Sequence, residues 1–115
     1  MATKEKIVDD ICILHVKGKL MGGPETDECH NKLKSVVEDR DIKKFIIDLS
    51  NVKWVNSRGL GMLMACFTSL KNADSELKLA GVSKKVNSLL MMTKLNTIFE
   101  CYDNADQAIG SYKAK

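Results

Sequence analysis

Segments with the patterns of β-strands and of α-helices alternate along this chain, and no other feature restricts its fold as strongly. Apolar, β-forming runs predict strands at Ile11–Lys17, Lys43–Leu49, Leu77–Ala80 and Ile98–Tyr102, with a further short strand expected near Ile7. Apolar residues at helical spacing predict helices at Pro24–Asp39, at Ser57–Ala73, after Ser83, and after Asn104 to about Tyr112. Strands and helices that follow one another in turn favour an α/β fold with a largely parallel sheet.

The expected helix starts carry residues suited to that position. Pro24 fits the first helical position because its missing N–H would have had no partner there. Ser83 can cap the third helix through its hydroxyl, and Asn104 followed by Gln107 resembles a capping box. The glycine-rich stretch from Gly18 to Gly23 is predicted to be a loop.

Length and composition restrict the class of protein. A chain of 115 residues has the size of one domain, so we expect residues 1–115 to form a single domain. The net charge of +3 comes without the dense basic stripe of a nucleic-acid-binding protein, so no direct nucleic-acid contact is expected. No apolar run approaches the length of a membrane span, and no signal peptide is visible, so a cytoplasmic location is expected.

The sequence contains no recognisable motif for binding a metal or a cofactor or for catalysis. The four cysteines include no Cys-x-x-Cys pair, and the two histidines lack the spacing of a ligand pair, so no metal is expected. Neither a phosphate-binding loop nor a Gly-x-Ser-x-Gly elbow is present, and no other cofactor is indicated. These observations favour a binding protein over an enzyme.

The segment from Asp48 to Gly61 is the strongest candidate for a functional site. A buried strand ends there, the chain turns, and a helix begins near Ser57. Free backbone N–H groups and the positive end of the helix dipole would stabilise a phosphate on Ser57. The alternative is that Ser57 or Asn56 only caps the helix, which stabilises it by about 1 kcal/mol.

The same segment resembles the signature of the STAS domain, which sulfate transporters share with bacterial anti-sigma factor antagonists. The resemblance rests on Asp48-Leu49-Ser50-x-Val52 and Asn56-Ser57-Arg58-Gly59-Leu60-Gly61, and it extends to Gly18-Lys19-Leu20, Leu77–Val82 and Leu95–Phe99. It implies a small mixed, mostly parallel sheet with about four helices packed mainly on one face.

The resemblance also implies a function. Free-standing bacterial members of the family bind an anti-sigma factor, which is also a serine kinase of the histidine-kinase-like ATPase class. That kinase phosphorylates a serine that matches Ser57 here, and a PP2C-class phosphatase removes the phosphate. The chain would then be a substrate and a regulator of transcription. The alternative is a STAS-fold binding module without a switch, such as a scaffold or an accessory subunit of a transporter.

Three positions depart from the family pattern: Asn56 replaces an aspartate, Arg58 replaces a serine or threonine, and Met21 replaces an acidic residue. Asn56 keeps a capping oxygen but carries no charge. Arg58 could pair with a phosphate on Ser57. Because all three flank the expected phosphorylation site, we expect Met21, Asn56 and Arg58 to contact the partner together with Ser57.

The helix after Ser57 is expected to add a docking surface. Helical spacing places Leu60, Leu63, Met64, Phe67 and Leu70 toward the sheet. The opposite side, with no charge before Lys71, is expected to bind the partner through Met62, Ala65 and Cys66, beside Ser69. The alternative is that a neighbouring helix or a second copy of the chain covers this side.

Overall fold

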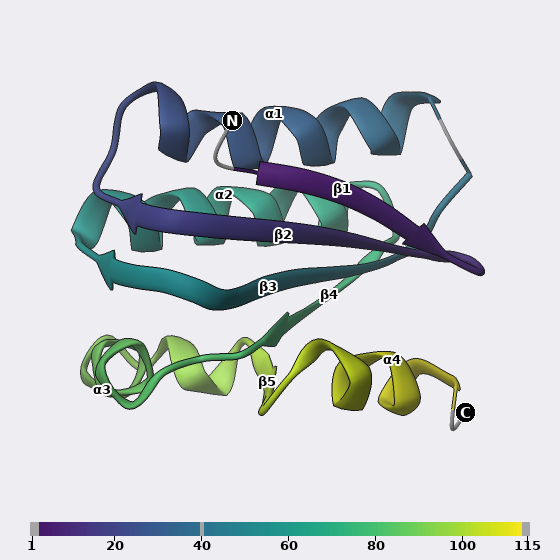
Figure 1. The fold of residues 1–115 in the computed structure, drawn as a ribbon. Coiled ribbons are helices and arrows are strands. Elements are labelled where there is room, and N and C mark those ends of the chain that lie inside the picture. The colour runs from purple at the N-terminus through teal and green to yellow at the C-terminus, as the bar shows by residue number, and fades with distance from the viewer. Residues whose placement is uncertain (1–2, 40, 114–115) are drawn as a thin grey trace.

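The computed structural model describes residues 3–39 and 41–113, which form one mixed five-stranded sheet and four α-helices (Figure 1). The strands are β1 (Thr3–Val8), β2 (Ile11–Leu20), β3 (Lys44–Val55), β4 (Glu76–Ala80) and β5 (Glu100–Tyr102). The helices are α1 (Pro24–Asp39), α2 (Ser57–Asn72), α3 (Lys84–Met92) and α4 (Ala105–Lys113), with the 3-10 helix η1 (Leu95–Thr97) before β5. Only β1 is antiparallel to its neighbour among these strands, so the predicted α/β class is confirmed.

Three of the four helices share one face of the sheet. The strands lie in the order β1-β2-β3-β4-β5, so each parallel connection moves to the next strand in the same direction. Right-handed crossovers then place α1, α2 and α3 on the same side. The main core on this side includes Leu14, Ile47 and Leu79 from the strands and Leu33, Leu63 and Leu90 from the helices. Figure 1 shows α1 and α2 along one side of the sheet and α4 along the other. The predicted arrangement, with helices mainly on one face, is therefore confirmed.

The helix starts follow the predicted chemistry. Pro24 is the first residue of α1. The Ser83 hydroxyl accepts a hydrogen bond from Val86 N at 3.2 Å. The Asn104 side chain accepts one from Gln107 N at 2.8 Å, and the Gln107 side chain accepts one from Asp103 N. The caps of α3 and α4 each satisfy a backbone N–H that the helix itself leaves unpaired, and Pro24 has no N–H to satisfy.

Strands β2 and β3 extend beyond their predicted ends, and Gly18 lies within β2 where a loop was expected. His15 faces Asp48 and Leu20 faces Val55, so five steps along β2 oppose seven along β3. The two extra residues are accommodated as bulges in β3, which change the direction of the side chains that follow. As a result, buried residues recur at every third position, and each intervening pair is exposed: Leu49, Val52 and Val55 are buried, and Ser50, Asn51, Lys53 and Trp54 are exposed.

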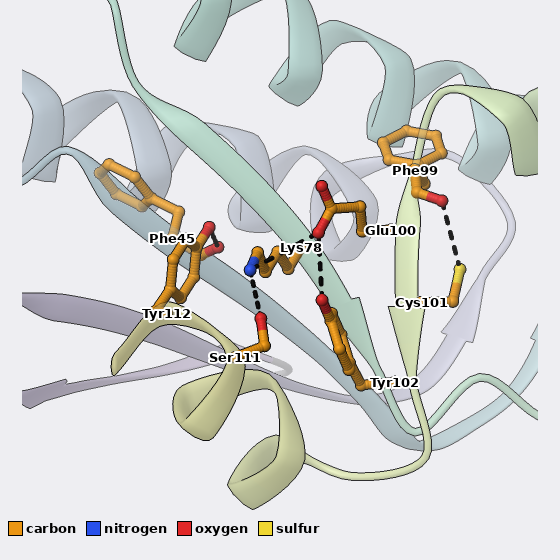
Figure 2. A network of polar contacts seen from close by, with 8 residues as sticks. All are labelled: Phe45, Lys78, Phe99, Glu100, Cys101, Tyr102, Ser111 and Tyr112. Atoms are coloured by element: carbon orange, nitrogen blue, oxygen red, sulfur yellow. Dashed lines mark hydrogen bonds and ion pairs between the residues drawn. The ribbon is translucent and has the colours of Figure 1, made fainter. Parts of the chain in front are cut away.

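The second face of the sheet is covered by α4 around a buried lysine. Lys78 of β4 is only 4% exposed. Its Nζ donates a hydrogen bond to the Ser111 hydroxyl, lies 3.5 Å from a Glu100 carboxylate oxygen, and lies 4.1 Å from the ring centroid of Tyr112 (Figure 2). The Tyr112 hydroxyl donates to Phe45 O at 2.8 Å, and burial raises the pKa of Tyr112 above its ordinary value. These contacts hold α4 on the centre of the sheet.

Candidate functional site

The first turn of α2 meets the loop between β2 and α1, and Asn56 links the two. Its side-chain oxygen accepts a hydrogen bond from Gly59 N at 3.0 Å, which caps α2. Its side-chain nitrogen donates to Met21 O at 3.1 Å, and its backbone N donates to Leu20 O at 3.2 Å. An asparagine supplies both a donor and an acceptor, whereas an aspartate would only accept. Asn56 therefore fixes the α2 start against the preceding loop.

Ser57 is the first residue of α2, and its side chain is exposed. The cap of the helix is Asn56, so the capping role considered for Ser57 from the sequence belongs to its neighbour. Near Ser57, the free N–H groups of the first turn and the helix dipole favour a negative charge. The arrangement can therefore present a hydroxyl to another protein and accommodate an anion on it.

Arg58 extends over the loop between β2 and α1. A β-carbon added at Gly22 would lie 2.7 Å from Arg58 Cδ, so the guanidinium stem passes directly over this glycine. Met21, the residue before it, is 41% exposed. The structure thus brings together four of the predicted site residues, which are Met21, Asn56, Ser57 and Arg58.

Met62 and Cys66 do not form the exposed side that the sequence analysis assigned to them. Met62 is 6% exposed and Cys66 is fully buried, with the two sulfur atoms 3.5 Å apart. A hydrogen bond with Cys29 of α1, together with burial, raises the pKa of the Cys66 thiol. The expected exposure is wrong because α1 packs alongside α2, so α2 is covered on two sides. The structure agrees with the alternative given in the sequence analysis, in which a neighbouring helix covers this side of α2, and that helix is α1.

The rest of that side is also partly covered. Ala65 is half-buried, and Ser69 forms a hydrogen bond of 2.9 Å with His30 of α1. Conversely, Met64 and Phe67, which were expected in the core, are only partly buried and lie at its margin. The apolar pattern therefore predicted the buried side of α2 with a rotational error. The buried side is turned away from Met64 and Phe67 and toward Met62 and Cys66.

Asp48 of β3 connects its own strand with the neighbouring strand β2. Its carboxylate accepts hydrogen bonds from the backbone N and the hydroxyl of Ser50 and lies 2.7 Å from His15 Nδ1. Gly81 packs so closely on Ser50 that an added β-carbon would lie 2.7 Å from Ser50 N. Burial by itself would raise the pKa of Asp48, but the Ser50 hydrogen bonds and His15 outweigh it and hold the pKa below its ordinary value. The Asp-Leu-Ser motif thus has a structural role.

We expect Asp48→Asn to lower the free energy of unfolding by about 1–2 kcal/mol at pH 7, since it removes charge-assisted hydrogen bonds. A carboxylate with a lowered pKa stabilises the fold above its unfolded pKa and loses that contribution as the pH falls through its folded pKa. The difference between wild type and variant should therefore shrink below about pH 4. Urea unfolding at pH 7 and at pH 3 measures it, with the exposed-site variant Asp41→Asn as the control. A difference that stays constant down to pH 3 would contradict this account.

Two hollows share Lys53 in their linings, and the smaller of them includes Met21 of the site. The larger, of about 690 Å³, has two lysines and two glutamates in its lining: Lys17, Lys53, Glu25 and Glu28. The smaller, of about 360 Å³, is lined by Lys19, Met21, Lys53 and Trp54. Among the described residues no group of three His, Cys, Asp or Glu side chains is placed to hold a metal ion. No helix within the described ranges is long and apolar enough to cross a membrane.

Sequence reasoning did not single out Lys19, Lys53 and Trp54, which line the smaller hollow. Lys53 and Trp54 lie beyond Leu49, where the strand was predicted to end, and Lys19 lies in the stretch that was predicted to be a loop. One signal was available: the single tryptophan of the chain follows a lysine and precedes the candidate helix by a few residues.

The fold and the site define an α/β domain with an exposed serine at the start of its second helix. The family model of the STAS domain matches residues 3–108, and the chain belongs to that family. Among curated proteins, it is 38% identical over 72 residues to an anti-sigma-B factor antagonist of Listeria monocytogenes. That match spans 60% of this chain and 63% of the length of the relative. A putative anti-sigma factor antagonist of Thermotoga maritima is 26% identical over 113 residues, with 96% of each chain covered.

Solved structures agree on the fold. The crystal structure of a putative anti-sigma factor antagonist from Thermotoga maritima superposes with a TM-score of 0.78 at 26% identity, covering 95% of this chain and 92% of that one. The Bacillus cell fate determinant SpoIIAA in its phosphorylated form gives a TM-score of 0.76 at 13% identity, covering 96% and 99%. The second likeness, at that identity, concerns the fold alone.

Proposed function

We propose that this chain is an anti-sigma factor antagonist that acts as a partner switch. In the proposed cycle, the unphosphorylated chain binds an anti-sigma factor, and the sigma factor held by that protein is released. The anti-sigma factor is also a serine kinase of the histidine-kinase-like ATPase class. It transfers the γ-phosphoryl group of ATP to Ser57 Oγ and releases ADP, which ends the binding. A PP2C-class phosphatase hydrolyses the phosphoserine and restores the hydroxyl.

The observation that carries this proposal is the exposed Ser57 at the start of a helix whose cap is supplied by Asn56. A hydroxyl that does not cap its helix is available to a kinase, and a phosphate in its place is favoured by the helix dipole. Relatives named as anti-sigma factor antagonists support the same role. The chain is accordingly a binding protein and a kinase substrate in a cytoplasmic regulatory system.

Binding should depend on the charge at Ser57. A phosphate carries about −1.5 to −2 charges at neutral pH, and its water shell must be removed at a close interface. Arg58 is near enough in sequence to pair with that phosphate, which would draw its side chain away from Gly22. A partner that contacts Met21, Asn56 and Ser57 together would therefore meet both a new charge and a changed loop surface.

The phosphorylation site can be mapped directly. Protein purified from its own host should contain a fraction with one added phosphate, located at Ser57 by fragmentation in a mass spectrometer. Ser57→Ala should abolish this fraction, whereas Ser50→Ala, at an exposed serine of β3, should retain it. Phosphate that persists in the Ser57→Ala variant would place the site elsewhere.

The switch itself is tested on the same variants. A serine kinase that copurifies with wild type should copurify with Ser57→Ala and be lost with Ser57→Asp, which adds a negative charge. Equal recovery with both variants, together with no phosphate on the native protein, would favour the binding module without a switch.

A further inference from the structure

The smaller hollow, whose lining includes Met21 of the candidate site, combines charged and apolar side chains. Trp54 is 41% exposed, and Met21 on the facing loop is 41% exposed as well. Lys19 is the register partner of Trp54 on the neighbouring strand. Lys53, the residue before Trp54, completes the hollow of about 360 Å³. The lining therefore combines two cations with an aromatic and an aliphatic side chain, and it includes no acidic residue.

The bulges of β3 create this surface. In a regular strand, Lys53 and Trp54 would point to opposite faces of the sheet. The register shift between Gly18 and Lys19 instead leaves both exposed, while Val52 and Val55 on either side are buried. β-Bulges are over-represented next to active sites, where they redirect a side chain, and here they redirect Trp54.

A third lysine, Lys85 of α3, lies over Trp54. Its Nζ is 4.5 Å from the ring centroid of Trp54, a distance at which a cation is attracted to an aromatic face. One face of the indole is thereby occupied by a positive charge. Lys19, Lys53 and Lys85 come from three different elements, and all three are exposed. An approaching group meets positive charge on more than one side of the ring.

We infer that this hollow binds an acidic segment of the protein partner that carries one apolar side chain. The apolar side chain would pack on Trp54 and Met21, and flanking carboxylates would pair with Lys19 and Lys53. Charge complementarity selects this occupant, because the larger neighbouring hollow balances its lysines with glutamates and the smaller one does not. This inference rests on the proposed partner-binding function and names the chemistry of the partner.

The position of the hollow relates it to the switch. Met21 lines the hollow, and its carbonyl accepts the hydrogen bond from the Asn56 side chain, directly before Ser57. A phosphate on Ser57 would bring negative charge to the edge of a site that binds carboxylates. Like charges repel, so phosphorylation should weaken the binding of an acidic segment without any rearrangement of the fold.

The proposal can be tested without knowing the partner. A phage library of random twelve-residue peptides is selected on the unphosphorylated protein and, in parallel, on Trp54→Ala. Peptides enriched on wild type alone should contain aspartate or glutamate on both sides of one leucine, isoleucine or aromatic residue. Because Trp54 is the only tryptophan of the chain, its emission should change when a tryptophan-free selected peptide binds.

Matched variants then locate the peptide. Fluorescence anisotropy of the labelled peptide should show affinity lower by about tenfold or more for Trp54→Ala and for Lys53→Glu. Lys6→Glu changes the net charge equally but lies on β1, opposite Ile13 and away from Lys19, and it should retain wild-type affinity. The wild-type affinity should also fall as salt is raised.

Three results would overturn the inference: selected peptides that are basic or uncharged, peptides selected equally on Trp54→Ala, or self-association of the protein through this surface in sedimentation. None of these measurements requires a kinase. Failure to find phosphate on Ser57 would therefore count against the switch alone, and failure of the selection would count against the hollow alone.

Discussion

Gly59→Ala is expected to destabilise the protein by about 3 kcal/mol, at the upper end of the cost of overpacking. A β-carbon at this position would lie 2.2 Å from the carbonyl oxygen of Leu20 and 2.9 Å from Val55 Cγ1. The first of these atoms is backbone at the end of β2, so it cannot move aside by a side-chain rotation. The α2 start would have to separate from β2, and the Asn56 hydrogen bond to Leu20 would be lost with it. Urea unfolding followed by circular dichroism measures the change.

Gly61→Ala provides the matched control on the same helix. Among the described residues, no heavy atom beyond the chain neighbours and the backbone of the helix itself lies within 4 Å of a β-carbon added at Gly61, and the residue is exposed. Alanine in a helix interior is favoured over glycine by about 0.5–1 kcal/mol, so this variant should be more stable than wild type. Similar effects of the two substitutions would show that helix propensity, and not the approach to Leu20, determines the cost at Gly59.

Tyr112→Ala is expected to lower the free energy of unfolding by about 3–5 kcal/mol, as other truncations of large aromatic core residues do. Tyr112 is 1% exposed and belongs to the core beneath α4, with Ile13, Ile46 and Ala108. The substitution would remove the ring beside Lys78 Nζ and the hydroxyl that bonds to Phe45 O. The buried lysine would then lose one of its favourable contacts while it stays covered.

Tyr112→Phe separates the two contributions. It keeps the ring against Lys78 and removes only the hydrogen bond to Phe45 O, so a loss of about 1 kcal/mol is expected. Chemical unfolding of both variants at neutral pH gives the comparison. A small loss for Tyr112→Ala would mean that α4 contributes little to the stability of the sheet.

The helices could be predicted well because their signals are local. Pro24 and Ser83 act on the turn in which they occur, and the structure places α1 and α3 next to them. The start of α2 at Ser57 was predicted for the same reason, whereas the strand before it was predicted to end at Leu49 and in fact extends to Val55. Local chemistry determines where a helix starts, and it needs no knowledge of the neighbouring elements.

The side of α2 that binds α1 could not be predicted from α2 alone. Met62 and Cys66 are apolar, and the same helix sequence is compatible with burial against a partner protein or against another helix of the same chain. The deciding contact with Cys29 comes from residues far away in the chain. The extension of β3 to Val55 was not predicted for a different reason. Two bulges replace the alternating burial pattern of a strand by burial at every third residue, so the segment that contains Val52 and Val55 lacks the sequence pattern of a strand.

The order of the strands in the sheet has a consequence for synthesis of the chain. Since β1 to β5 are neighbours in the order in which they are translated, each strand after β1 finds a hydrogen-bonding partner that has already been synthesised. The sheet can therefore grow at a single open edge, without a strand waiting for a distant partner. Helix α4 follows all five strands in the chain, and until it packs on the sheet Ile13, Ile46 and Lys78 are uncovered. A nascent chain that has emerged from the ribosome only as far as residue 104 would expose this face of the sheet to chaperones, while the surface around Ser57, to which α4 contributes no residue, is already formed.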